Sequence, residues 1–263
     1  MMPMDTLKLH LEIVDWMMTA GQMIRDSFTT PLTITEKSGY RDLVTDVDQG
    51  IERFFIEQIR RNYPEHKILG EEGQGDRIAS LEGYVWIIDP IDGTMNFIQE
   101  QGHFGIMIAL YKDGVGLLGY IYDVMNDRLY AGIKDKGAYC NGRRLSVLPE
   151  KSLSQGLLHI NGNTLLRATP AIKAIAKKSL GTRSIGAASI EAISVFTGRA
   201  VGYITYHAAS WDIAASMIIA KELGIGASKL DGHDIDLLDS KHKIVLGSER
   251  LRKEVIEHLA EDV

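Results

Sequence analysis

The sequence predicts a mixed fold of the α+β or α/β class, with a helix-and-sheet half over residues 1–145 and a smaller α/β half over residues 146–263. Apolar residues recur at helical spacing in the first quarter of the chain, and short runs rich in Ile, Val and Tyr begin at Tyr84. After about residue 145, helix-like and strand-like segments alternate. No long linker separates the halves, so we expect one compact unit with a shared cleft.

The first quarter of the chain is predicted to be helical. One helix carries the apolar residues Leu7, Leu11, Val14 and Met18. A second helix, DVDQGIERFFIEQIRRNY, carries the apolar residues Ile51, Phe54, Phe55 and Ile59. Each set has the spacing of one helix face.

The middle of the chain is predicted to form one partly antiparallel sheet, because Gly and Asp turns separate its apolar runs. The four runs are YVWIID, FGIMIALY, GVGLLGYIYD and RLYAGI. In the second half, GLLHI and VGYITY predict strands. The segments TPAIKAIAKKS, AASIEAISVF and WDIAASMIIAKEL predict helices, and a last helix is expected after Ser248.

Composition narrows the class of protein. A net charge of -6 gives no electrostatic footprint for nucleic acid or for an anionic membrane. The single Cys140 cannot form an internal disulfide and has no zinc-ligand spacing around it, which is typical of a cytoplasmic protein. No uninterrupted apolar segment is long enough to cross a bilayer. We therefore expect neither nucleic acid nor membrane as a partner.

The stretch WIIDPIDGTMNF places Asp89 and Asp92 directly after a buried apolar run. Neighbouring carboxylates raise each other's pKa unless a cation neutralises them, and a site with only oxygen ligands favours Mg²⁺ over zinc. Pro90 has no amide hydrogen and fixes one backbone angle, which would help to aim the Ile91 carbonyl at the same cation. The competing interpretation is that both aspartates only form a turn.

Gly93 and Thr94 follow and are predicted to begin a helix, whose first amides could bind phosphate. The competing interpretation of Thr94 is a simple helix cap.

Three other acidic segments are ambiguous by themselves. Glu71 and Glu72 lie between glycines after a short apolar run, where one could complete a metal site or both could be solvated. Asp212 begins a predicted helix, where capping is its usual role. The aspartates of DLVTDVD, which include Asp48, are explained equally well as helix caps.

Taken together, these segments resemble the inositol monophosphatase family of the lithium-sensitive, Mg²⁺-dependent phosphatases over nearly the whole chain. The matching motifs, in family order, are DLVTDVD at 42–48, GEE at 70–72, WIIDPIDGTMNF at 86–97, GAA at 186–188 and WDIAA at 211–215. The resemblance implies a layered α-β-α-β-α sandwich of the type shared with fructose-1,6-bisphosphatase.

The resemblance also implies two metal sites that share Asp89. One site would use Glu71, Asp89 and the Ile91 carbonyl, and the other Asp89, Asp92 and Asp212. Two Mg²⁺ ions would shield the phosphate charge, activate water and stabilise the leaving alkoxide.

The remaining family positions supply catalysis and phosphate binding. Thr94, paired with Asp48, would orient the attacking water together with Glu71, and the amides of Gly93 and Thr94 would bind phosphate. Lys37 matches a position near the metal loop, where it would offset carboxylate charge or contact phosphate; a solvated surface lysine is the alternative.

The expected substrate is inositol monophosphate or a related small phosphorylated polyol, contacted through Asp92, Asp212 and the small residues Gly186, Ala187 and Ala188. Tight helix packing is the alternative interpretation of the small residues. Relatives selective for inositol carry a Glu where this chain has Thr205, and a site that loses one hydrogen-bonding partner discriminates less sharply. Fructose 1,6-bisphosphate and the 2'-phosphate of NADP therefore remain alternative substrates.

The resemblance further implies a homodimer and inhibition by Li⁺. The competing hypothesis from another class is a sugar-phosphate-binding or regulatory protein without turnover. Such a protein is expected to lose metal carboxylates, whereas Glu71, Asp89, Asp92 and Asp212 are all present here.

Overall fold

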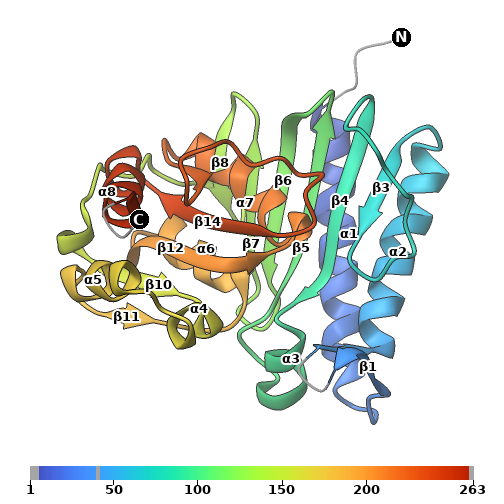
Figure 1. Cartoon of the computed structure of the whole chain (residues 1–263). Helices are drawn as coiled ribbons and strands as arrows, with labels where there is room; N and C mark the ends of the chain where they lie inside the picture. The colour runs from blue at the N-terminus through green and yellow to red at the C-terminus, as the bar shows by residue number, and fades with distance from the viewer. Residues whose placement is uncertain (1–5, 40–41, 261–263) are drawn as a thin grey trace.

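The computed structural model describes residues 6–39 and 42–260, which form five stacked layers of helices and sheets (Figure 1). Helices α1 and α2 cover one face of a seven-stranded sheet, and α6 and α7 cover its other face. A five-stranded sheet lies beyond α6 and α7, and helices α5 and α8 cover its outer face. The expected α-β-α-β-α sandwich is confirmed.

The larger sheet is formed by seven strands in sequence order. They are β3 (Lys67–Gly70), β4 (Tyr84–Asp92), β5 (Gly105–Lys112), β6 (Val115–Asp123), β7 (Arg128–Ile133), β8 (Gly137–Cys140) and β9 (Arg143–Arg144). Strands β3 and β4 are parallel, and all later neighbours are antiparallel. The four strands predicted from the apolar runs are β4 to β7, and their partly antiparallel pairing is confirmed.

The outer helices of this sheet are α1 (Thr6–Ser27) and α2 (Asp46–Asn62). Both are predicted correctly, but α1 buries a different face from the one whose spacing predicted it. Its buried face consists of Leu9, Ile13, Trp16, Met17, Ala20, Gly21 and Ile24. Leu7 and Leu11 are instead exposed and border a groove between α1 and β7. The helix therefore has two apolar stripes, of which the fold buries one.

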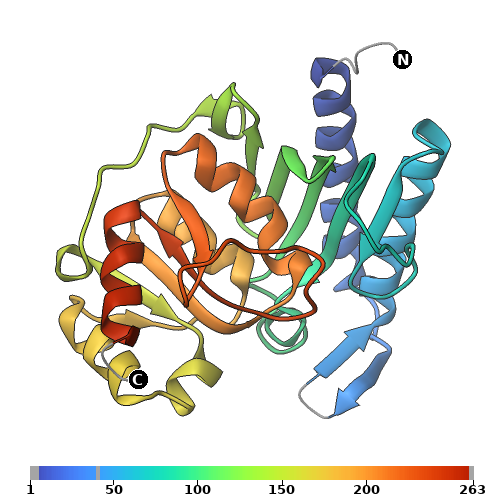
Figure 2. The same cartoon turned by 45° about the horizontal axis from the view of Figure 1, so that its top comes forward.

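The prediction that the first quarter is entirely helical is wrong between α1 and α2. Strands β1 (Ile34–Gly39) and β2 (Asp42–Thr45) form an antiparallel hairpin there, which projects beyond the first turn of α2 (Figure 2). β1 is ITEKSG and β2 is DLVT, so their apolar residues are too few to form a run that would predict strands.

The central layer consists of α6 (Ala188–Phe196) and α7 (Ser210–Glu222). Helix α7 lies directly against the larger sheet because that sheet has glycines beneath it. A Cβ atom at Gly119 would lie 2.7 Å from the carbonyl oxygen of Ala215, and one at Gly132 would lie 2.7 Å from the Cα of Ile219. This close approach brings the first turn of α7 to the end of β4.

The smaller sheet has the strand order β11-β10-β12-β14-β13. Its strands are β10 (Leu157–Ile160), β11 (Thr182–Arg183), β12 (Ala200–Ala208), β13 (Gly226–Lys229) and β14 (His242–Gly247). The surrounding helical segments are η1 (Leu153–Gln155), α4 (Gly162–Leu166), α5 (Pro170–Lys178) and α8 (Glu249–Ala260). No helix in residues 6–39 or 42–260 is long and apolar enough to cross a membrane.

Candidate active site

The two aspartates of β4 point to the same side of the larger sheet because the strand contains an irregularity between them. Asp89 lies opposite Met107 of β5, and Asp92 lies opposite Gly105. Three steps along β4 thus match two steps along β5, which is the count of a β-bulge. In a regular strand, residues three apart face opposite sides. The extra residue turns Asp92 toward the central helices, where Asp89 already points.

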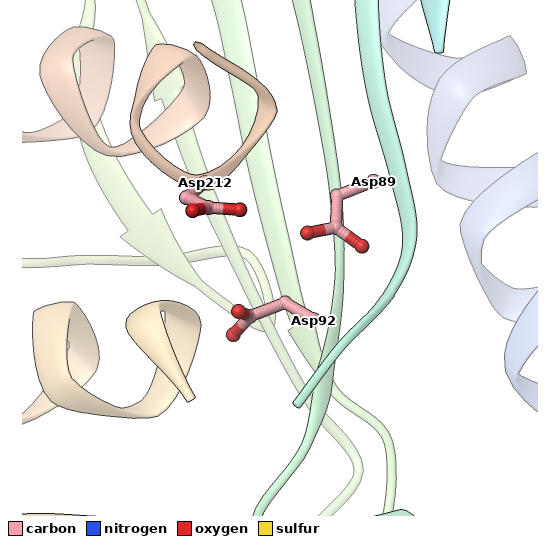
Figure 3. A group of neighbouring side chains, drawn as sticks. All are labelled: Asp89, Asp92 and Asp212. Atoms are coloured by element: carbon pink, nitrogen blue, oxygen red, sulfur yellow. The ribbon is translucent and has the colours of Figure 1, made fainter. Parts of the chain in front are cut away.

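Asp212 completes the acidic group from the first turn of α7. Its carboxylate accepts a hydrogen bond of 2.8 Å from the Ala209 amide, so it does contact the helix start as a capping residue would. One oxygen of each of Asp89, Asp92 and Asp212 lies within 4.8 Å of the other two. Figure 3 shows the three carboxylates converging from β4 and α7. The structure thus brings together three of the predicted metal ligands.

Burial and mutual repulsion perturb the carboxyl groups of this site. Burial, followed by the charges of Glu71, Asp92 and Asp212, raises the pKa of Asp89 well above its ordinary value. Burial also raises the pKa of Asp92 to about 6, although hydrogen bonds from Ser189 and Ala188 oppose the shift. Oδ1 of Asp89 is buried and has no hydrogen-bond partner among residues 6–39 and 42–260. A hard divalent cation fits these residues, because carboxylate oxygens are its preferred ligands and its charge would relieve their repulsion.

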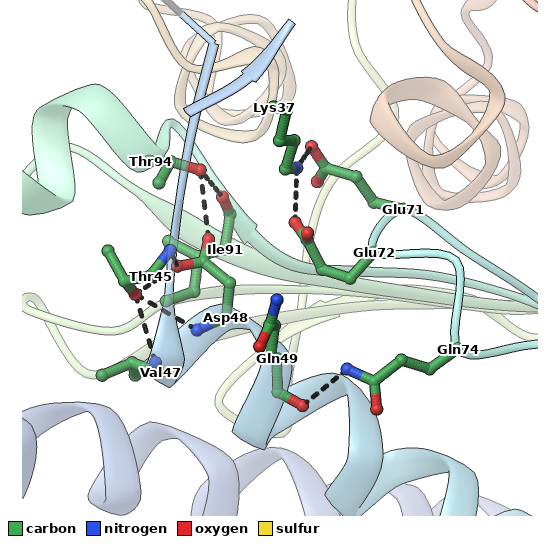
Figure 4. Close-up of polar contacts among 10 residues, drawn as sticks. All are labelled: Lys37, Thr45, Val47, Asp48, Gln49, Glu71, Glu72, Gln74, Ile91 and Thr94. Atoms are coloured by element: carbon green, nitrogen blue, oxygen red, sulfur yellow. Dashed lines mark hydrogen bonds and ion pairs between the residues drawn. The ribbon is translucent and has the colours of Figure 1, made fainter. Parts of the chain in front are cut away.

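Glu71 and Glu72 follow β3 and are bridged by Lys37 of the hairpin (Figure 4). The Lys37 ammonium lies 3.0 Å from an oxygen of Glu71 and 2.5 Å from one of Glu72. Burial lowers the pKa of Lys37, but the two carboxylates outweigh it and leave the pKa raised. The 23% exposed Lys37 side chain is therefore ion-paired with both glutamates.

Thr94 links the start of α3 (Thr94–Glu100) to the start of α2. Its hydroxyl lies 3.2 Å from Oδ1 of Asp48 and 3.1 Å from the carbonyl oxygen of Ile91. Asp48 is fully buried and also accepts hydrogen bonds from the amide and hydroxyl of Thr45, in a capping box. The cap predicted for Asp48 is thus present, and its second oxygen remains directed at Thr94.

The small-residue segment, residues 186–188, packs against Gly93. Gly93 has a φ of 89°, and a Cβ atom there would lie 2.7 Å from the Cβ of Ala187. The Ala188 amide donates to Asp92 over 3.1 Å, and Gly186 is exposed beside them. The structure therefore places the predicted phosphate-binding and alcohol-binding segments in contact.

Thr205 is buried on β12, and its hydroxyl accepts a 3.1 Å hydrogen bond from the His207 amide. This contact is not to one of the predicted metal ligands.

Two buried carboxylates near the site were not predicted. Glu52 lies on the buried face of α2, and burial followed by the charge of Glu72 raises its pKa to about 7. Its spacing from Asp48, Phe55 and Ile59 places it on one helix face with them, a signal that the sequence does contain. Glu191 lies on α6 and contacts the backbone of Ile185 and Gly186. The sequence of α6 gave no indication of that contact.

Comparisons with known proteins agree with this geometry. A model of the inositol monophosphatase family matches residues 9–263. The inositol-1-monophosphatase of Bacillus subtilis (strain 168) is 42% identical over 246 residues, which cover 92% of each chain.

Solved structures match equally broadly. Inositol monophosphatase II from Staphylococcus aureus MSSA476 is 34% identical with a TM-score of 0.84, over 95% of this chain and 92% of that one. An inositol monophosphatase/NADP phosphatase complexed with Mg²⁺ and phosphate is 28% identical with a TM-score of 0.88, over 97% and 95% of the two chains. From its fold, its acidic group and these matches, the chain belongs to the inositol monophosphatase family and is a phosphoric monoester hydrolase.

Proposed function

We propose that this enzyme hydrolyses inositol monophosphate, or a related small phosphorylated polyol, with Mg²⁺ as its cofactor. The observation that carries the proposal is the convergence of Asp89, Asp92 and Asp212 within 4.8 Å, with one buried oxygen of Asp89 that no described residue hydrogen-bonds. Three carboxylates so close together would be costly without a cation. The Mg²⁺ held by a related structure supports the choice of metal.

The residues that would hold metal fall into two overlapping sets. Glu71, Asp89 and the Ile91 carbonyl form one, and Asp89, Asp92 and Asp212 form the other. When bound, Mg²⁺ supplies charge neutralisation of the phosphate and activation of water. The Lys37 contact with Glu71 and Glu72 balances part of the carboxylate charge when metal is absent.

The protein's own groups would then position the reactants. Thr94, whose hydroxyl contacts Asp48, is placed to orient the attacking water together with Glu71. The amides of Gly93 and Thr94 would donate to the phosphate oxygens. Water attacks phosphorus as the bond to the alcohol oxygen breaks, and the products are inorganic phosphate and the free alcohol.

The alcohol part of the substrate would contact Asp92, Asp212 and the segment Gly186–Ala188. Thr205 has no carboxylate that could recognise ring hydroxyls, and its buried hydroxyl binds the His207 amide. This feature favours a permissive enzyme, and fructose 1,6-bisphosphate and NADP remain second candidates. The NADP phosphatase activity named for one structural neighbour supports including NADP in the test.

The proposal is tested by measuring phosphate release from inositol 1-phosphate, fructose 1,6-bisphosphate and NADP with Mg²⁺. Highest kcat/KM for inositol 1-phosphate is expected. A preference for another of the three would correct the substrate and make Thr205 the first residue to change. Turnover that continues after chelation of divalent cations would contradict the metal assignment.

We also propose a homodimer, a cytoplasmic location and inhibition by Li⁺, all supported by family membership, and by the single Cys140 for the location. Light scattering tests the dimer. Activity measured at about 10–50 mM Li⁺ tests the inhibition, and activity at the same concentration of Na⁺ is the control for ionic strength. We further propose that residues 1–145 supply most of the metal ligands and that residues 146–263 complete the site through Asp212.

A further inference from the structure

The segment Ile185–Ser189, which joins β11 to the first residues of α6, is held by carboxylates from two directions. On one side Asp92 accepts hydrogen bonds from the amide of Ala188 over 3.1 Å and from the amide of Ser189 over 2.7 Å. The Ser189 hydroxyl also donates to Asp92. These bonds tie the beginning of α6 to the acidic group.

On the other side the segment is held by Glu191, one turn into the same helix. A single oxygen of Glu191 accepts hydrogen bonds from the Ile185 amide over 2.7 Å and from the Gly186 amide over 3.2 Å. Its other oxygen accepts from Nδ1 of His159 on β10. Glu191 and His159 are exposed by only 1% and 5%. Such burial of a carboxylate is tolerated only when its oxygens are satisfied, as they are here.

A side chain of α3 also holds the segment, by a hydrogen bond to the Ile185 carbonyl oxygen. Nδ2 of Asn96 on α3 donates to the carbonyl oxygens of both Ile185 and His103, each over 2.9 Å. Gly186 itself has a φ of 89° and is exposed. The peptide group between Ile185 and Gly186 is therefore bonded by side chains at both its carbonyl and its amide, while Gly186 itself is exposed.

We propose that Glu191, held in place by His159, is a positioning residue that sets the Gly186–Ala188 wall of the alcohol pocket and thereby tunes recognition of the substrate's alcohol. The inference rests on the proposed function, because it takes that segment as part of the pocket. Within the described part of the chain, the Glu191 carboxylate hydrogen-bonds His159, Ile185 and Gly186 rather than the three convergent aspartates or Thr94, so its effect acts through the segment. A residue needed only for packing would not require a charge in this position.

Because Glu191 and Asp92 hold different parts of the segment, loss of Glu191 should affect binding of the alcohol and the chemistry at phosphorus differently. Without Glu191, the amides of Ile185 and Gly186 lose their acceptor, whereas the bonds from Ala188 and Ser189 to Asp92 remain. Binding of the alcohol should weaken, while the chemistry at phosphorus should continue. A purely structural role would instead lower the activity toward all substrates together.

The test compares Glu191→Ala with Glu191→Gln, which keeps an oxygen that can accept from the two amides. The matched control is Glu222→Ala, because Glu222 also accepts from two loop amides, those of Asp135 and Gly137, but lies at the far end of α7. Steady-state constants are measured with inositol 1-phosphate and with p-nitrophenyl phosphate, which has no polyol.

We expect Glu191→Ala to raise KM for inositol 1-phosphate about tenfold or more, with kcat for p-nitrophenyl phosphate within about threefold of wild type. Glu191→Gln should recover most of the lost affinity, and Glu222→Ala should match wild type. An unchanged KM in Glu191→Ala, or an equal loss with both substrates, would overturn the proposal.

Amide hydrogen exchange provides a readout that needs no turnover and separates this inference from the substrate assignment. Exchange at Ile185 and Gly186 should quicken in His159→Gln, which releases Glu191, but not in Glu191→Gln or in Glu222→Ala. Unaltered exchange in His159→Gln would overturn the positioning role, and would do so even where Glu191→Ala fails to fold. Wild-type protein that is inactive on inositol 1-phosphate but active on another ester would instead correct the proposed substrate.

Discussion

Asp89 and Asp92 face the same side of the larger sheet although they are three positions apart. The reason is a bulge: β4 advances three residues from Asp89 to Asp92 while the paired β5 advances two. The bulge turns Asp92 toward Ser189 and Ala188 of α6, and it leaves Asp89 facing Asp212 of α7. A strand with regular alternation would have sent one of the two carboxylates into the core beneath α1 and α2. The irregularity is therefore what assembles the acidic group.

The acidic group should make the stability of the metal-free protein depend on pH. Asp89, Asp92 and Asp212 all have raised pKa values in the folded state, about 6 for Asp92, so the folded protein holds protons that the unfolded chain releases. Their contribution is complete below the ordinary carboxyl pKa of about 4 and is lost as the pH rises through the folded values.

We therefore expect Mg²⁺ at about 5 mM to raise Tm more at pH about 7.5 than at pH about 5.5, because Mg²⁺ replaces protons. Thermal unfolding with and without Mg²⁺ measures this, and Asp92→Asn should reduce the difference. An equal shift at both pH values would show that the carboxylates do not titrate as argued.

Thr94 should affect turnover more than binding. Thr94→Val removes the hydroxyl that contacts Asp48 and Ile91, and we expect kcat to fall about a hundredfold with KM nearly unchanged. Thr94→Ser keeps the hydroxyl and is the matched control, expected to stay within about tenfold of wild type. If Thr94→Val retained wild-type kcat, Thr94 would have no part in orienting water.

Gly105 should be needed for the close approach of α6 to the larger sheet. A Cβ atom there would lie 2.8 Å from the Ser189 hydroxyl and 3.1 Å from the carbonyl oxygen of Tyr122. We expect Gly105→Ala to reduce the free energy of unfolding by about 1–3 kcal/mol. Gly50→Ala is the control, since nothing lies within 4 Å of its added Cβ, and in the middle of α2 it should stabilise by about 0.5–1 kcal/mol. Denaturant unfolding measures the stability of both variants. Destabilisation of Gly105→Ala alone would show that the steric contact of the added methyl matters, whereas equal changes in both would contradict this.

The sequence predicts strands and helices well where apolar periodicity is strong. RLYAGI coincides with β7, and WDIAASMIIAKEL overlaps α7 within one residue at each end. It fails at the β1–β2 hairpin, whose two short strands pair with each other and contain no long apolar run. It also mistakes the buried face of α1, because both faces of that helix carry apolar residues and only tertiary packing chooses between them.

For the site, the sequence supplies the carboxylates but not their geometry. The Asp-Pro-Ile-Asp spacing indicates neighbouring acids, yet the bulge that aligns them depends on the register with β5. Glu191 and His159 are 32 positions apart and lie on different elements, so no local pattern connects them. The contacts of Lys37 with Glu71 and Glu72 likewise follow from the fold of the hairpin over β3.

The most direct test of the account is phosphate release from inositol 1-phosphate by wild type and by Asp89→Asn at saturating Mg²⁺. Because Asp89 would belong to both metal sets, we expect the variant to lose Mg²⁺-dependent turnover. Its metal-free Tm should equal or exceed that of wild type, since Asn removes a buried negative charge without changing the side chain's shape. A folded Asp89→Asn protein that retains wild-type turnover would contradict the central claim that the acidic group is the catalytic metal site.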